Sequence, residues 1–307
     1  DNIKEVIPEF LMLLKGVIDC PDLPLNVSRS ALQNDGFVKK ISDYITKKVA
    51  DKLSGMCKTD RENYEKYWDD INPFIKFGCL KDEKFDEKMK DYILYKNLDG
   101  KYLTLADCLE ENKEKHENKI FYVTDEKEQS QYINMFKANG QDAIIMSHSI
   151  DNPFISQEEQ KHENLKFLRI DADVNDTLRE EVKEEDKEAL KKQEETLTET
   201  FKKALGDDKL QVKVEKLKDA EISSMITLSE ETRRMQDMMK MYNMGMDASM
   251  FGGSGQVLVL NANNKLVQYV LEHTDGENTP KICEQLYDLA QLSHGSLTPE
   301  RMTKFIA

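Results

Sequence analysis

The stretch that decides the fold is KIFYVTDEKEQSQYINMFKANGQDAIIM, residues 119–146. Two short apolar runs, KIFYV at 119–123 and AIIM at 143–146, flank a segment whose apolar residues recur at helical spacing. Gly140 stands where a helix C-terminal cap belongs. A strand, a helix and a strand in so short a stretch predict a βαβ unit with a parallel pair and a right-handed crossover. A third short strand is predicted at 167–170.

The residues before this unit have the pattern of helices. Apolar residues recur every three or four positions over 2–18, 31–55 and 59–97, which predicts three helical stretches. We expect Asn72-Pro73 and Gly78 to interrupt the third of them, because proline lacks the backbone donor and glycine is a poor helix former. The first 115 residues should therefore be mainly helical.

The residues after the unit mix both kinds of element. Charge dominates 171–193, which is typical of a solvated linker or of an exposed helix start, so we expect a domain boundary there. A helix is predicted at 195–205, and strands are predicted at LQVKVEKL (210–217) and QVLVLNA (256–262). The last 30 or so residues have a helical pattern. The whole chain is therefore predicted to be a mixed α+β and α/β protein.

Composition excludes several classes of function. The 307 residues carry a net charge of −15, which repels nucleic acid and anionic membranes, and no apolar run approaches the roughly 20 residues of a membrane helix. The five cysteines are odd in number and form no CxxC pair, which argues against a disulfide framework and a zinc site and favours a reducing compartment. The five histidines show no metal-ligand spacing, so no metal site is predicted.

A methionine-rich segment is the first functional candidate. Seven of the 14 methionines fall between 235 and 250. Met235, Met238, Met239 and Tyr242 share one face of an amphipathic helix, which Thr227 or Ser229 would cap. An apolar stripe of this kind is often packed into the core of the protein. Methionine specifies packing poorly and suits a surface that fits many apolar partners, so a promiscuous binding surface and a core remain open alternatives.

The C-terminal helices are the second candidate. They carry apolar stripes that either dock on the preceding strands or pair with a second copy of the chain, and the pattern leaves both open. The chain begins without Met and stops two turns into a helix after Thr298, so we expect a piece of a longer protein. The stripe residues proposed for pairing are Ile282, Leu286, Leu289, Leu292 and Phe305.

Six motifs, in order along the chain, resemble the heat-shock protein 90 chaperones, and most closely their bacterial members. The first is the most specific and resembles the helix and catalytic loop of the family's middle domain. The motifs are IPEFLMLLKGVIDCPDLPLNVSRSALQ (7–33), FIKFG (74–78), KIFYVTDE (119–126), IIMSHSIDNPF (144–154), LVLNANNKLV (258–267) and LYDLAQLSHGSL (286–297).

The resemblance implies a homodimeric, ATP-dependent, cytoplasmic chaperone for non-native client proteins, with ATP and Mg²⁺ bound by an N-terminal domain that this chain lacks. Residues 1–115 would be the end of the large middle subdomain, with the catalytic loop and a helical connector. Residues 116–182 would be a small three-layer αβα subdomain, and 183–307 an α+β dimerisation domain with C-terminal helices. The piece itself should bind neither ATP nor metal and should not hydrolyse ATP.

The resemblance also implies roles for individual residues. Arg29 would reach the γ-phosphate of ATP held by the N-terminal domain, supported by Gln33, with Asn26 in the same loop. Arginine suits this task because it is permanently charged and presents a fork of donors to phosphate. Clients would contact Met235, Met238, Met239 and Tyr242, although Glu231 replaces an upstream apolar residue of that motif. Phe154 would be a further client contact, one position later than the family's aromatic.

A different class of function was weighed on the residues alone. A small-molecule enzyme could have its site at the carboxyl ends of the βαβ strands, near Thr124, Ser147 and His148. Ser147 and His148 are adjacent in sequence, lack an evident acidic partner and follow no nucleophile-elbow pattern. The chaperone hypothesis is therefore preferred.

Overall fold

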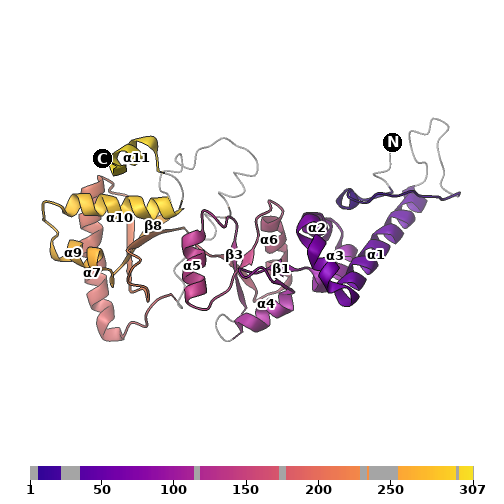
Figure 1. The fold of residues 1–307 in the computed structure, drawn as a ribbon, viewed down its shortest axis with the longest axis horizontal. Coiled ribbons are helices and arrows are strands. Elements are labelled where there is room, and N and C mark those ends of the chain that lie inside the picture. The colour runs from indigo at the N-terminus through magenta and orange to yellow at the C-terminus, as the bar shows by residue number, and fades with distance from the viewer. Residues whose placement is uncertain are drawn as a thin grey trace. The chain divides into compact units, whose positions relative to one another are not determined.

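A computed structural model describes residues 6–21, 35–113, 118–172, 178–228, 234, 255–294 and 297–306. The described residues form helices and small sheets, so the predicted mixed α/β class is confirmed (Figure 1). They group into two compact units: unit 1 comprises 1–118 and 150–166, and unit 2 comprises 119–149 and 167–307. This grouping differs from the predicted domains 1–115, 116–182 and 183–307, which stay predictions.

Unit 1 is mainly helical. Helix α2 packs against α1, α3 and α6, and it buries two large side chains, Tyr64 and Trp68. The one two-stranded sheet in the described part of this unit is antiparallel. The elements are η2 (Glu9–Leu11), α1 (Asp35–Thr59), α2 (Arg61–Lys81), α3 (Glu83–Met89), η3 (Lys90–Tyr92), β1 (Tyr95–Lys96), β2 (Tyr102–Leu103), α4 (Leu105–Asn112) and α6 (Asp151–Lys161).

Helix α2 continues through Pro73, so the predicted interruption is wrong at both places. Pro73 cannot donate to the carbonyl of Asp69, but the side-chain amide of Asn72 donates to that oxygen at 3.1 Å. Gly78 is also inside the helix, where a Cβ would come within 2.6 Å of the Phe10 ring and 2.8 Å of the Phe85 ring. The Asn72 amide therefore compensates for the donor that Pro73 lacks, and Gly78 leaves room for the Phe10 and Phe85 rings.

The helix predicted over 2–18 is also wrong for the described residues. Only the 3-10 turn η2 forms there, and it buries Phe10 and Leu11. Beyond it, the two remaining side chains of the predicted stripe are exposed, Leu14 to 47% and Ile18 to 40%. Helices in proteins are held mainly by burial of their apolar face, and no described residue buries this one.

The first sheet of unit 2 has the strand order β4-β3-β5. Strands β3 (Lys119–Val123) and β4 (Ile144–Ile145) are parallel, with Tyr122 opposite Ile144, and α5 (Ser130–Ala138) connects them. This confirms the predicted strand–helix–strand unit and its parallel pair. The third strand, β5 (Lys166–Arg169), lies within one residue of its prediction.

The second sheet of unit 2 is mixed, with the order β6-β8-β7. Strand β8 pairs parallel to β6 and antiparallel to β7, and helices α7 and α10 pack on the sheet around Phe201, Leu258 and Leu286. The elements are α7 (Glu184–Leu205), β6 (Gln211–Glu215), β7 (Ser224–Leu228), β8 (Gln256–Asn261), α9 (Lys265–Glu272), α10 (Thr279–His294) and α11 (Pro299–Ile306).

Two predictions for this part need correction. Helix α7 begins at Glu184 rather than 195, so half of the charged stretch is an exposed helix start. Strand β7 was not predicted, and Thr227, one of the two alternative caps of the predicted methionine helix, is inside it opposite Val257. All five residues of β7 are buried.

Candidate functional site

The structure describes only part of the segment that was predicted to contain the catalytic loop. Arg29, Gln33 and Asn26 lie outside the described residues. Before the loop, the ring centroid of Phe10 lies 4.9 Å from that of Phe85 in α3. After it, the described chain resumes with α1. Phe10, α1 and α3 all belong to unit 1.

The methionine segment likewise lies outside the described residues, including Met235, Met238, Met239 and Tyr242. The neighbouring Arg234 is described, and its guanidinium donates to the carbonyl oxygen of Phe167 at 3.0 Å. The choice between a core stripe and a binding surface therefore stays open.

Phe154 lies in the interior of unit 1. Its side chain is 1% exposed, and the ammonium of Lys76 stands 5.7 Å from the centroid of its ring. Lys76 also forms an ion pair with Asp151 at 2.5 Å, and both side chains are almost fully buried. A client could reach Phe154 only if α6 left α2, so its role as a client contact stays a prediction.

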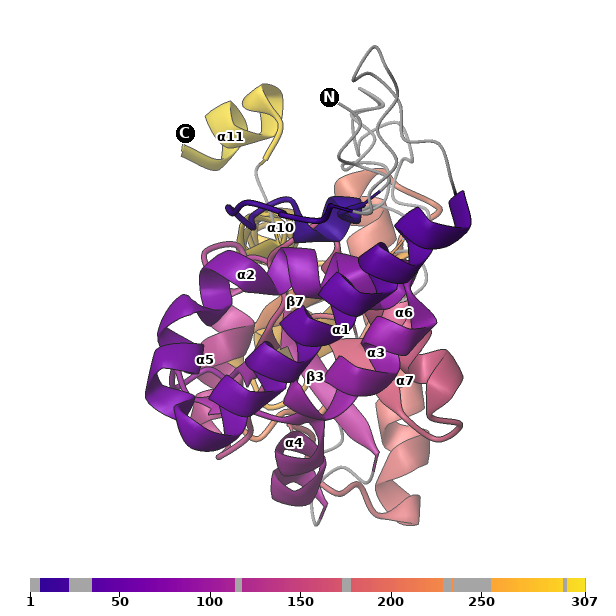
Figure 2. The same ribbon diagram turned by 90° about the vertical axis from the view of Figure 1, so that its right-hand side faces the viewer.

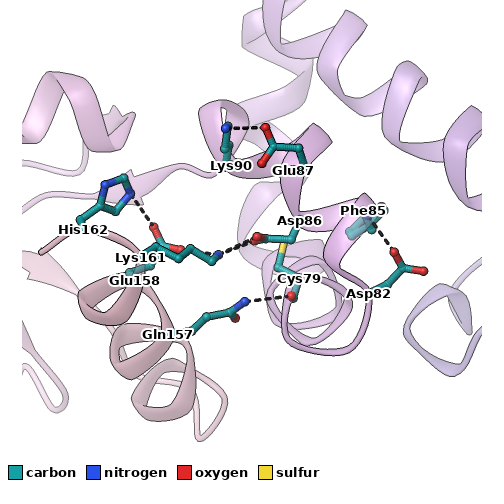
Figure 3. Close-up of polar contacts among 10 residues, drawn as sticks. All are labelled: Cys79, Asp82, Phe85, Asp86, Glu87, Lys90, Gln157, Glu158, Lys161 and His162. Carbon is teal, nitrogen blue, oxygen red and sulfur yellow. Dashed lines mark hydrogen bonds and ion pairs between the residues drawn. The ribbon is translucent and has the colours of Figure 1, made fainter.

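A second polar cluster fastens α6 to α3 (Figure 3). The Lys161 ammonium lies 2.7 Å from Asp86 and 3.0 Å from Glu158, and both carboxylates are nearly buried. Gln157 donates to the carbonyl of Cys79 in α2 at 3.2 Å, and His162 lies 3.9 Å from Glu158. Sequence reasoning missed this cluster, because Lys161 and Asp86 are 75 residues apart and form no local motif.

The chemistry of this cluster is structural. Burial acts to lower the pKa of Lys161, but its hydrogen bonds to Asp86 and Glu158 raise that pKa above the usual value. Burial, with the nearby Asp86 carboxylate, raises the pKa of the Cys79 thiol well above its usual range. A charged lysine and a protonated thiol offer neither a base nor a nucleophile at neutral pH. The cluster therefore acts as a clamp between helices.

The predicted dimer residues divide between core and surface. Leu286 is 1% exposed and belongs to the core of unit 2, and Ile282 packs against the same core. Leu289, on the outer side of α10, is 46% exposed. Leu292 and Phe305 are half-buried. The structure thus places part of the predicted stripe inward and leaves Leu289 on the surface.

Helix α11 is held to α10 by charge. Arg301 forms an ion pair with Asp288 at 2.6 Å and covers the Tyr287 ring at 4.8 Å from its centroid. Lys304 pairs with Glu284 at 2.6 Å. No side chain of α11 is buried, so its apolar residues do not complete a core with the described part of this chain.

The residues proposed for the alternative function, a small-molecule enzyme, do come after the parallel strands β3 and β4. Thr124 comes directly after β3, where the nearly buried side chain of Gln129 accepts its backbone N–H at 2.8 Å. Ser147 and His148 come after β4 and are exposed. An exposed pair offers no enclosed place for a substrate.

The structure has a pocket of about 290 Å³ elsewhere in unit 2. It lies at the C-terminal end of α5, against the loop 217–222, and Met135 and Leu178 contribute apolar walls. Asn261 holds that loop by donating to the carbonyls of Asp219 and Ile222. A helix that follows a parallel strand ends at the opposite edge of the sheet, so this pocket is away from the edge where α/β enzymes bind substrates.

Two features are absent from the described residues. Within them, no three His, Cys, Asp or Glu side chains are placed to hold a metal ion. No helix in the described part of the chain is both long enough and apolar enough to cross a membrane.

Comparison with known proteins assigns the class. The family model described as "Hsp90 protein" matches residues 1–306, so the chain belongs to the Hsp90 family. It is 38% identical over 294 residues to the chaperone protein HtpG of Bacteroides thetaiotaomicron, covering 92% of this chain and 42% of that protein. It is 35% identical over 304 residues to the HtpG of Porphyromonas gingivalis, covering 95% of this chain and 44% of that protein.

The chain therefore spans less than half the length of these relatives. The predicted resemblance is confirmed, and both relatives are named as chaperones. Neither the comparisons nor the exposed Ser147 and His148 favour a small-molecule enzyme.

Proposed function

We propose that this chain is the middle and C-terminal part of an ATP-dependent chaperone that binds non-native proteins and dimerises through α10 and α11. The observation that carries the proposal is the family match over residues 1–306. A cytoplasmic location fits an odd number of cysteines, all of them free. ATP and Mg²⁺ would bind the part of the protein that precedes this chain.

Arg29 is the proposed contact to the γ-phosphate, with Gln33 and Asn26 supporting the loop. A permanently charged guanidinium stabilises charge that builds up during phosphoryl transfer, and its position on a second domain would couple hydrolysis to closure. The test is Arg29→Ala in the full-length protein. We expect slower ATP hydrolysis, by about 10³-fold or more for an arginine in this role, with nearly unchanged nucleotide affinity. Unchanged hydrolysis would contradict the role.

Client binding is proposed for the methionine segment. The argument is its composition: flexible, polarisable side chains fit apolar partners of many shapes. Replacing Met235, Met238 and Met239 with Ser should weaken suppression of aggregation of a denatured test protein and leave the unfolding midpoint unchanged. A cooperative loss of stability would instead identify the stripe as core.

Dimerisation is proposed through the exposed side of α10 and through α11. Leu289 is half exposed and Ile306 is 76% exposed, while Ile282 and Leu286 of the α10 stripe are already used in the core. An apolar residue left on a helix surface next to a second uncovered helix is typical of an interface between copies.

A further inference from the structure

Helix α1 presents a dense series of lysines on a protein whose net charge is −15. Six of its 25 residues are lysine and three are aspartate. Lys40, Lys47 and Lys48 are all exposed, as is Tyr44 between them. Their spacing of four, seven and eight residues from Lys40 places them on one face of the helix.

The acidic residues of this face are already paired from another helix. Asp43 lies 3.7 Å from Lys84 and Asp51 lies 3.0 Å from Lys88, both lysines of α3. Figure 2 shows α1 crossing unit 1 with α3 beside it. Lys84 and Lys88 of α3 therefore offset the two carboxylates on this face of α1 and leave the lysines of α1 as its excess positive charge. Within the described part of the chain, Lys40, Lys47 and Lys48 have no salt-bridge partner.

The resulting patch is named the α1 basic surface. It consists of Lys40, Tyr44, Lys47, Lys48 and Lys52 of α1, with Lys84 and Lys88 of α3.

The charges of this surface act on the groups within it. The hydrogen bond from Lys88 lowers the pKa of the Asp51 carboxyl, and the charges of Lys47 and Lys48 lower it further. Tyr44 adds an apolar element: its side chain is 60% exposed, and the Lys48 ammonium lies 5.5 Å from its ring centroid. An exposed aromatic residue with lysines on either side of it along the helix suits a ligand that carries both negative charge and apolar groups.

We propose that the α1 basic surface docks an acidic segment of another protein, with carboxylates on the lysines and an apolar side chain against Tyr44. The size of the surface favours a short segment: Lys40 to Lys52 spans about 18 Å at 1.5 Å per helical residue. The electrostatic screening length is about 8 Å at physiological ionic strength. The charges of a short bound segment therefore interact with this patch rather than with the charge of the whole protein. Nucleic acid or an anionic membrane would extend over the acidic remainder.

The test uses the full chain and a short fluorescein-labelled peptide that alternates Glu with Leu. Fluorescence anisotropy measures its affinity for the wild type, for Lys47→Glu/Lys48→Glu, and for Tyr44→Ala. The matched control is Lys191→Glu/Lys192→Glu, which makes the same charge change at two adjacent exposed lysines of α7. Lys47→Gln/Lys48→Gln serves if the charge reversal fails to fold, as judged by circular dichroism.

We expect the Lys47/Lys48 reversal to weaken binding roughly tenfold, because exposed charge pairs contribute modestly to affinity and reversal turns attraction into repulsion. Tyr44→Ala should weaken it less, and the α7 control should bind like the wild type. Equal losses in the α7 control, or no loss at Lys47 and Lys48, would overturn the proposal. So would tighter binding of single-stranded DNA or of phosphatidylserine vesicles than of the peptide.

Discussion

Lys76 and Asp151 form a buried ion pair at 2.5 Å that joins α2 to α6 across 75 residues of sequence. The Lys76 ammonium also faces the Phe154 ring, so one lysine fixes both the start of α6 and its buried aromatic side chain. Removal of one member of a buried pair leaves a charge without its counter-ion, which costs more than the pair contributes.

The first prediction concerns this pair. Asp151→Asn should lower the free energy of unfolding by about 3–5 kcal/mol, because the Lys76 ammonium would stay buried without a carboxylate. Urea denaturation followed by circular dichroism measures it. The double variant Lys76→Met/Asp151→Asn should recover part of the loss. A loss below about 1 kcal/mol for Asp151→Asn would show that the pair is not buried in solution.

The second prediction concerns the proline inside α2. Asn72→Ala should cost about 1–3 kcal/mol, because it removes the donor that satisfies the Asp69 carbonyl. In a Pro73→Ala background the backbone N–H of residue 73 can bond that carbonyl, so Asn72→Ala should cost less there. Equal costs in both backgrounds, measured by thermal unfolding, would show that the Asn72 amide does not replace the missing donor.

The third prediction compares two helical glycines. Gly55 in α1 has no atom within 4 Å of an added Cβ, so Gly55→Ala should stabilise by about 0.5–1 kcal/mol through helix propensity. Gly78→Ala gains the same propensity but meets the Phe10 and Phe85 rings, and overpacking of this kind costs about 1–3 kcal/mol. Melting temperatures should therefore rise for Gly55→Ala and fall for Gly78→Ala. A rise for both would mean that Phe10 does not pack on α2.

The fourth prediction concerns thiol reactivity. Burial raises the pKa of Cys283 to about 12, and burial also raises the pKa of Cys79, so both stay protonated and covered at pH 8. Iodoacetamide at pH 8 should modify the partly exposed Cys20 first, and Cys79 and Cys283 only after unfolding, when their pKa returns to about 8.5. Mass spectrometry of digested samples gives the order. Early labelling of Cys283 would contradict the packing of α10.

The raised pKa of Cys283 also fixes the sign of its effect on stability. Its contribution is complete below the unfolded pKa of about 8.5. It declines as the pH rises through that value toward the folded pKa of about 12, because the unfolded state releases its proton first.

The sequence predicted those elements whose buried residues form a recognisable local pattern. Strand β3 is an apolar run with all but its first residue buried, and its parallel partner β4 follows at βαβ spacing. Strand β7 was not predicted, because two of its buried residues, Ser224 and Thr227, are polar. Ser224 is satisfied by donating to the carbonyl of Leu286, a partner 62 residues away that no local pattern indicates.

The candidate sites likewise combine features that a local pattern predicts with features that depend on distant parts of the fold. The outward position of Leu289 and the inward position of Leu286 follow from α10 lying on β7, which the periodicity of one helix could not decide. The charged stretch near 184 was correctly seen as solvated, but helix formation there depends on packing of the later residues Leu197 and Phe201 into the core. The α1 basic surface depends on Lys84 and Lys88 of α3, which only the fold brings beside α1.

The most direct test of the proposed function is the solution mass of this chain, measured by multi-angle light scattering over a concentration series. The proposal predicts a mass near twice 35.6 kDa, and a shift toward one chain mass in Leu289→Glu/Ile306→Glu. Leu266→Glu/Tyr269→Glu, a matched change at two exposed apolar residues of α9, should remain dimeric. A mass of 35.6 kDa at every concentration, or loss of the dimer in the α9 control alone, would contradict dimerisation through α10 and α11.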